Sequence, residues 1–321
     1  LESSYMISFF QRFWPWVVLA VTGTAWGLTF SLTKMATNTG AAIIGIAFWQ
    51  ALISGLMLMG YALIRNGHIG IRWRHIPLIT AVSVTGILVP GLIFYAATRH
   101  VQPGILAIAD ALVPMMTFAL AFLLGFEKNS MRRLIGLLAG ITGILLLVVP
   151  DSSLPDEAAT FWVLLACFGA ACYAVENLII DAYQPADLGP IRLSVGMNIF
   201  AACILLPLAL ATDHFFIPQF PMGVLEWSIL GIALISAVAY SSFVYLIVST
   251  GPVFASQVGF MVTITGVLWG IVIFGDTYAA SVWLALVIMM IGLALVTPRK
   301  DTSPAPPLPP SGVKPFPPPS E

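Results

Sequence analysis

The stretch "WVVLAVTGTAWGLTFSL", residues 16–32, returns later in the chain as "WVLLACFGAACYAVENL", residues 162–178. At this offset of 146 residues, Gly23 aligns with Gly169 and Leu32 aligns with Leu178. Further pairs align at offsets of 149 or 150 residues: Pro103 with Pro252, Glu127 with Asp276, Gly143 with Gly292 and Tyr95 with Tyr245. Short insertions in the connecting loops explain the drift. The alignment therefore predicts that the chain consists of two related halves.

The composition places both halves in a membrane. Of the 321 residues, 59% are hydrophobic and only 8% are charged, whereas an ordinary soluble protein has about 25% charged residues. So little charge predicts a polytopic protein whose surface contacts membrane lipid. The net charge of −1 and the lack of basic runs argue against a nucleic-acid partner.

The apolar runs predict where the chain crosses the membrane, because about 20 apolar residues span the hydrocarbon core as a helix. Ten spans are expected, at residues 14–35, 40–64, 76–98, 103–125, 132–149, 159–180, 190–212, 224–248, 253–274 and 280–297. The expected domains are a cytoplasmic N-terminal segment (1–13), a first five-helix repeat (14–149), an external linker (150–158), a second five-helix repeat (159–298) and a proline-rich cytoplasmic tail (299–321).

The basic residues predict the orientation. With the N-terminus in the cytoplasm, eleven of the thirteen Lys and Arg residues lie on the inner side, and only Lys34 and Arg99 lie on the outer side. The positive-inside rule therefore places both termini in the cytoplasm. Because each repeat has an odd number of spans, the predicted fold is an all-α integral membrane protein whose ten transmembrane helices form two inverted five-helix repeats. Such repeats are typical of secondary transporters, although a duplicated membrane protein without transport activity would share them.

Three segments resemble a known family. "YAATRHVQPGILAIADALVPMMTFALAFLLGFEKNSMRRLIGLLAGITGILLLV" (95–148) resembles the signature of helices 3–5 in the EamA-like branch of the drug/metabolite transporter superfamily, with Pro114 and Gly143 at its recurring positions. Residues 251–296, with the pair Gly275–Asp276, and "TAWGLTFSLTK" (24–34) resemble it too. The resemblance implies a carrier of small metabolites whose central cavity is lined mainly by helices 1, 3, 4, 6, 8 and 9.

Two features depart from the family pattern. Phe126 separates Gly125 from Glu127, which interrupts the glycine-acid pair of the first repeat. Asp110 stands where the family would have a small or apolar residue. The second departure could mark a substrate preference of this protein.

Glu176 lies within a predicted span, and charged residues in spans seldom face lipid. Helical periodicity places Trp26, Phe30 and Lys34 on one face of the first span, and the repeat puts Glu176 in the position of Phe30. We therefore expect Glu176 to face the cavity, where it could carry a coupling proton or bind a cationic group of the substrate. A structural hydrogen-bonding role and a position near the wet cytoplasmic end stay open.

Asp110 lies one turn before Pro114, whose missing N–H favours a kink. Asp110 could contact the substrate, carry a coupling proton, pair with Arg99 or Lys34 as an external gate, or only mark a wet helix end. Arg99 could instead grip a substrate carboxylate, because a guanidinium group binds carboxylate in two places. A positive residue together with separated acids would suit a zwitterion.

The remaining candidates are aromatic and amide side chains within spans, which could line the site or simply join helices. They are Trp26, Phe30, Trp49, Gln50, Tyr95, Tyr173, Asn177, Tyr240, Tyr245, Gln257 and Trp269. The sequence shows no catalytic triad, metal-ligand spacing or nucleotide-binding loop. We therefore expect no enzyme activity, no cofactor and no metal.

These observations predict a secondary active transporter of the bacterial inner (plasma) membrane. We expect it to export a small-molecule substrate, above all amino acids or related amphipathic compounds, by alternating access, with proton coupling as an option. An exchanger or uptake carrier for another metabolite and a lipid-flippase-like membrane protein are the alternatives. The chain is expected to be a monomer or a weak homodimer.

Overall fold

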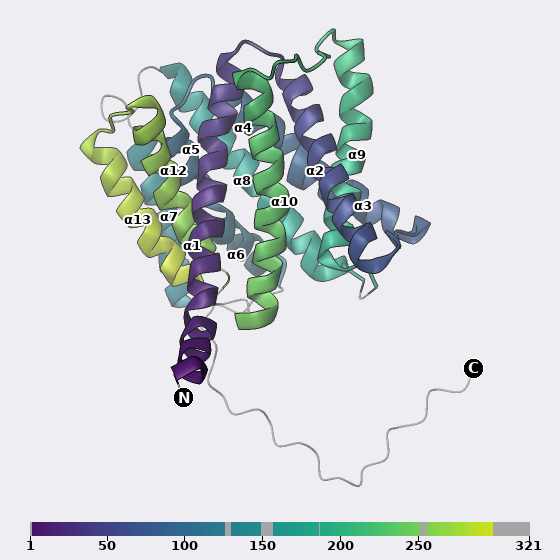
Figure 1. The fold of residues 1–321 in the computed structure, drawn as a ribbon. Coiled ribbons are helices and arrows are strands. Elements are labelled where there is room, and N and C mark those ends of the chain that lie inside the picture. Colours follow the sequence, from purple (N-terminus) through teal and green to yellow (C-terminus); the bar gives the residue numbers. More distant parts are fainter. Residues whose placement is uncertain are drawn as a thin grey trace.

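A computed structural model describes residues 2–125, 130–148, 157–185, 187–250, 255 and 257–297. Within these ranges all regular structure is helical (Figure 1). Eight helical segments are long and apolar enough to cross a membrane, and two shorter apolar helices complete the bundle. The predicted all-α membrane fold is therefore confirmed. Glu127, most of the predicted linker and the proline-rich tail lie outside the described residues.

The first half of the chain supplies five transmembrane segments. They are α1 (Glu2–Asn38); α2 (Ile43–Asn66); a third segment made of η1 (Trp73–His75), α3 (Ile76–Ser83), the π-helical η2 (Val84–Leu88) and α4 (Val89–Ala97); a fourth made of α5 (Pro103–Asp110) and α6 (Val113–Leu123); and α7 (Met131–Val148). The second half supplies α8 (Glu157–Tyr183), α9 (Pro190–Ala211), α10 (Val224–Thr250), α12 (Val258–Phe274) and α13 (Ala280–Val296).

Two segments that the sequence predicts as continuous helices are interrupted. Pro90 has no N–H to donate to the carbonyl of Gly86, and the helix widens into the π-helical turn η2 before it. In the same way Pro114 cannot donate to Asp110, and α5 ends there. At this second break the chain forms two hydrogen bonds that span three residues, as in a 3₁₀ turn. They run from the Ala111 N–H to the Ile108 carbonyl and from the Leu112 N–H to the Ala109 carbonyl.

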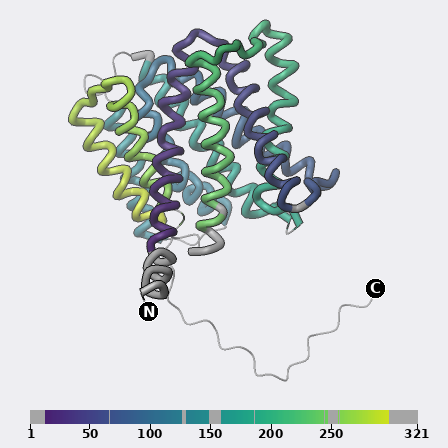
Figure 2. Tube along the Cα trace, in the orientation of Figure 1, coloured from purple at the N-terminus to yellow at the C-terminus, as the bar shows by residue number. Residues whose placement is uncertain are grey.

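The packing of the helices is nearly unchanged when the two halves are exchanged. In Figures 1 and 2, α1 lies between α10 and α12 and packs against both. Its counterpart α8 packs in the same way against α4 and against α5 and α6. Three further contacts join helices that correspond in the two halves: α2 with α9, α7 with α13, and α5 with α12. The pattern supports the repeat, while the inverted relationship stays a prediction.

Close contact between α7 and α13 depends on two glycines. A Cβ atom on Gly136 would lie 2.8 Å from the backbone oxygen of Gly292, and a Cβ atom on Gly292 would lie 2.8 Å from that of Gly136. Both distances are too short for real atoms, so only glycine permits this approach. Small residues commonly allow such packing in membranes, where lipid is as apolar as the helix faces.

Candidate functional site

Five of the predicted residues interact with one another between the helices, and one of them, Tyr240, also donates its hydroxyl to the Pro190 carbonyl at the start of α9, at 3.4 Å. Tyr173 on α8 interacts electrostatically with Asp110, Glu176 and Tyr95, and Glu176 interacts in the same way with Tyr240. These side chains come from four segments: α4, α5, α8 and α10. We refer to Tyr95, Asp110, Tyr173, Glu176 and Tyr240 as the central cluster.

An aromatic wall adjoins the central cluster. Tyr173 stacks on Phe94, with ring centroids 6.0 Å apart, and Phe94 meets Phe30 of α1 edge-on at 6.1 Å. Gly169 lies one turn before Tyr173 and leaves room for the same ring, since its Cβ atom would be 3.1 Å from Phe94. The sequence interpretation missed Phe94. Its position directly before Tyr95 was the available signal, but sequence alone did not reveal that its ring would meet Tyr173.

The carboxyl group of Glu176 packs against Gly86 in the π-helical turn of the third segment. A Cβ atom on Gly86 would lie 2.2 Å from Cδ of Glu176 and 2.3–2.4 Å from its two carboxyl oxygens, so the missing side chain makes room for the carboxyl group. The backbone is already altered here, because Pro90 cannot bond the carbonyl of Gly86. Within the described residues Glu176 has neither a hydrogen bond nor an ion pair. Gly86 was also missed from the sequence, although its spacing to Pro90 was visible.

Asp110 differs from its neighbours in being accessible. Residues 103–109 are buried, as are Ala111 and Leu112, yet Asp110 between them is partly accessible. Its side chain makes no hydrogen bond or ion pair in the described part of the chain. Because Asp110 ends α5, it lies at a discontinuous transmembrane helix, a feature that places polar groups at the substrate and ion sites of many transporters.

A chain of hydrogen bonds links Tyr95 of the central cluster to α2 and, through it, to α10. The Tyr95 hydroxyl donates to Oε1 of Gln50 on α2 at 3.5 Å, and Nε2 of Gln50 donates to the Ser54 hydroxyl at 3.3 Å. Ser54 in turn donates to the carbonyl of Ala233 on α10 at 3.0 Å. Gln50 therefore holds the hydroxyl of Tyr95 and connects both halves of the chain.

Two predicted tryptophans join helices outside the central cluster. Trp26 packs against Phe243 of α10, with centroids 5.8 Å apart, in an apolar cluster. Trp269 donates its indole N–H to the carbonyl of Thr24 at 3.0 Å, which ties α12 to α1. Both contacts are of the kind that fixes helix packing.

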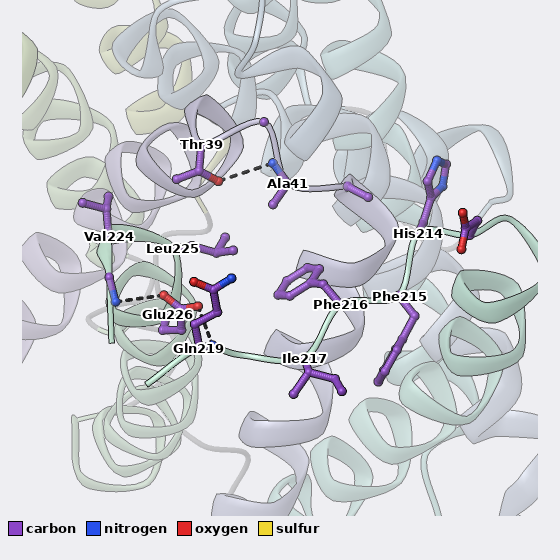
Figure 3. Close-up of a pocket in the computed structure, with 14 residues that line it drawn as sticks. Thr39, Ala41, His214, Phe215, Phe216, Ile217, Gln219, Val224, Leu225 and Glu226 are labelled. Atoms are coloured by element: carbon purple, nitrogen blue, oxygen red, sulfur yellow. Dashed lines mark hydrogen bonds between the residues drawn. The ribbon is translucent and has the colours of Figure 1, made fainter. Parts of the chain in front are cut away.

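Trp49 holds the segment that follows α9. Its indole N–H donates to the Phe216 carbonyl at 2.9 Å. This segment and the α1–α2 turn enclose a pocket of about 550 Å³ (Figure 3). The carboxylate of Glu226 in this pocket accepts the backbone N–H groups of Gln219 and Gly223, both at 2.9 Å. The residues that line the pocket include none of the central cluster. Its carboxylate, Glu226, is already bound to the backbone of the segment between α9 and α10.

The other predicted residues lie apart from one another. Arg99 is exposed and donates to the Ala41 carbonyl at 2.7 Å, at the end of the bundle opposite the N-terminus. Asn177 is exposed and donates to the Thr117 hydroxyl at 3.4 Å. Tyr245 is 46% exposed and lines an apolar groove of about 480 Å³ between α1, α2 and α10. Gln257 directly precedes α12.

A second polar group, the Asp276 cluster, joins the halves at the end opposite the N-terminus. The Tyr278 hydroxyl donates to Asp276 at 3.1 Å and accepts the backbone N–H of Gly104 at the start of α5. Lys34 lies over the ring of Phe274 at 5.6 Å and attracts the Asp276 carboxylate. Partial burial raises the pKa of Asp276, while Lys34 and the Tyr278 hydrogen bond lower it in part.

A third polar group, the Asp187 cluster, lies at the same end as the N-terminus. Asp187 follows α8 in the chain, and its carboxylate accepts a hydrogen bond from the Arg74 guanidinium. The same carboxylate lies 3.7 Å from Nη1 of Arg72 and 3.3 Å from Nε2 of the buried His75. The Arg74 hydrogen bond is the main cause that holds the pKa of Asp187 below its usual range. Because this pKa is lowered in the folded state, the contacts persist at neutral pH and are lost only as the pH falls through the lowered value.

Comparisons with known proteins agree with this architecture. The sequence model of the EamA-like transporter family matches residues 14–149 and, separately, residues 160–297. The chain is 25% identical over 292 residues to a protein of Escherichia coli K12 named "Uncharacterized inner membrane transporter YedA", covering 88% of this chain and 90% of the relative.

Two further similarities extend the comparison. An "Uncharacterized transporter" of Archaeoglobus fulgidus is 21% identical over 178 residues, covering 54% of this chain and 61% of the relative. One crystal structure has the same fold, with a TM-score of 0.58 at 15% identity, covering 88% of this chain and 96% of that one. With family matches over most of both halves, the chain belongs to the EamA-like transporter family.

Proposed function

We propose that the protein is a secondary transporter of the inner membrane that exports small amine-bearing metabolites, amino acids or related amphipathic compounds, by alternating access. The relatives named as transporters and the family match support the transport activity. The two matched ranges, which fall close to the predicted repeats, support two halves that exchange roles. With the basic residues on the inner side, both termini are cytoplasmic.

The central cluster is the observation that carries this proposal. Its acids and phenols come from both halves and lie within transmembrane segments, where an ionisable group is costly and usually marks a functional site. Glu176 and Asp110 are the candidates for proton coupling, because neither has an ion pair within the described residues. The Asp276 and Asp187 clusters lie at opposite ends of the bundle and each join the two halves. We assign them the role of alternate closures.

Solute flux into liposomes tests the proposal. The purified protein, reconstituted without ATP, is expected to move labelled amino acids or amines down their gradient, and a pH gradient is expected to change the rate if protons are coupled. Glu176→Gln should reduce the rate at least about tenfold, which corresponds to about 1.4 kcal/mol. Asp181→Asn is the matched control, because this acid is exposed on the same helix.

Each alternative gives a different result in the same preparation. Uptake or exchange would appear as flux that requires a second solute or the opposite gradient. A flippase would move labelled lipid between leaflets without solute flux, and an enzyme would convert the solute chemically. Absence of any protein-dependent solute flux would contradict the proposed function.

A further inference from the structure

We infer that the central cluster selects for the ammonium group of a small aromatic or apolar amine and provides no partner for a carboxylate. This inference rests on the proposed function and names its substrate class. Amines, and amino-acid esters or amides whose carboxylate is masked, would then be preferred over the free amino acids.

The first reason is the chemistry of the groups that meet there. Asp110 and Glu176 are partly accessible within the bundle, and neither has a hydrogen-bond or ion-pair partner among the described residues. The phenols of Tyr173 and Tyr240 add oxygen atoms beside them. An ammonium group carries positive charge and three N–H donors with no acceptor, so it matches a set of oxygen atoms.

The backbone breaks add to the same preference. Pro90 cannot donate the helical bond to the Gly86 carbonyl, and Pro114 cannot donate to that of Asp110. The carboxyl group of Glu176 packs against Gly86 at the first break, and Asp110 is itself the last residue of α5 at the second. Both acids therefore lie at helix interruptions where a backbone carbonyl lacks its usual α-helical donor.

The two basic residues that the sequence places on the outer side, Arg99 and Lys34, are committed elsewhere. Arg99, which the sequence offered as an anchor for a substrate carboxylate, donates to the Ala41 carbonyl on the surface. Lys34 lies over Phe274 and interacts with Asp276 at the end of the bundle. Neither is among the charges that act on Tyr173, Glu176 or Asp110. A carboxylate in the central cluster would therefore face two acids, and none of the basic residues in the described ranges is among the charges that act on them.

The apolar part of the substrate has a surface to rest on. Phe30, Phe94 and Tyr173 form a continuous set of ring contacts beside the acids. Aromatic faces attract cations and also pack against apolar groups, so a compact arylalkylamine satisfies both features at once. The symmetry-related region offers no equivalent, since the repeat places Phe30 opposite Glu176 and Gly259 opposite Asp110.

Five probes of similar size separate charge from shape. They are phenethylamine, phenylalanine methyl ester, phenylalanine, 2-phenylethanol and 3-phenylpropanoate. Their binding to the purified protein in lipid nanodiscs is measured by tryptophan fluorescence and thermal shift. Phenethylamine and phenylalanine methyl ester should bind at least about tenfold more tightly than phenylalanine. The alcohol should bind weakly, and the carboxylate should not bind. Equal or tighter binding of phenylalanine or 3-phenylpropanoate would overturn the inference.

Variants connect the preference to the acids. Glu176→Gln should weaken phenethylamine at least about tenfold and leave 2-phenylethanol unchanged, whereas Asp181→Asn should change neither. Glu176→Asp keeps the charge and should restore part of the amine affinity, which guards against a variant that fails to fold. If phenylalanine crosses liposomes but the amines neither bind nor cross, the substrate class is wrong while the transporter stands. If no solute crosses, the proposed function itself fails.

Discussion

Glu176 and Gly86 depend on each other, because the carboxyl group occupies the volume that a side chain at Gly86 would need. The atoms in conflict belong to the far end of a flexible side chain, so an added methyl group can push Glu176 aside without moving the backbone. This separates the position of the acid from the stability of the fold.

We therefore predict that Gly86→Ala folds normally but loses transport. The variant should keep or raise its thermal midpoint, since alanine favours a helix over glycine by up to about 1 kcal/mol. Its transport rate should fall at least about tenfold because Glu176 is displaced. Gly91→Ala is the control, because a Cβ atom there would meet nothing within 4 Å. A Gly86→Ala protein with unchanged transport and amine binding would contradict the assigned position of Glu176.

At the scale of the helices, the α7–α13 contact predicts a substitution that lowers the stability of the fold. A methyl group on Gly292 would meet the backbone oxygen of Gly136 at 2.8 Å, and a backbone cannot move aside as a carboxyl group can. We expect Gly292→Ala to lower the free energy of unfolding by about 1–3 kcal/mol, the usual cost of overpacking. Thermal unfolding in detergent measures the loss.

Gly259→Ala serves as the control for this experiment. Its Cβ atom would meet only a side-chain methyl group of Leu293, at 3.8 Å, which is ordinary contact. The control should unfold near the wild-type midpoint. Equal midpoints for Gly292→Ala and the wild type would mean that the two helices are not held at this distance in the membrane.

Sequence reasoning located the helices better than it located the site. Hydropathy is a local property, so the predicted spans agree with most helices to within a few residues. The breaks at Gly86 and Asp110 follow from prolines that were visible, but the sequence did not show that both breaks face α8. Placing Phe94 against Tyr173 requires the rotation of two helices about their axes, and packing sets that rotation.

For the molecule as a whole, orientation in the membrane is the prediction most open to direct test. With both termini in the cytoplasm, the segment after α9 faces outward and the loop before α3 faces inward. Ile217 and Trp73 are 77% and 90% exposed in these two regions. After replacement of the native cysteines, Ile217→Cys should react with a membrane-impermeant maleimide on intact cells, and Trp73→Cys should react only after lysis. The reverse pattern would invert the topology.

The two end clusters differ in how they respond to their surroundings. The ions of the Asp187 cluster are largely exposed, so dissolved salt screens them over about 8–10 Å at physiological concentrations. Tyr278, by contrast, inserts its hydroxyl between Gly104 and Gly270 and holds Asp276 by a short-range hydrogen bond that screening scarcely weakens. If the two clusters close opposite ends as proposed, we expect rising ionic strength to weaken the Asp187 cluster more than the Asp276 cluster. On that proposal, the salt concentration at the N-terminal end would shift the balance between the two open forms of the empty protein.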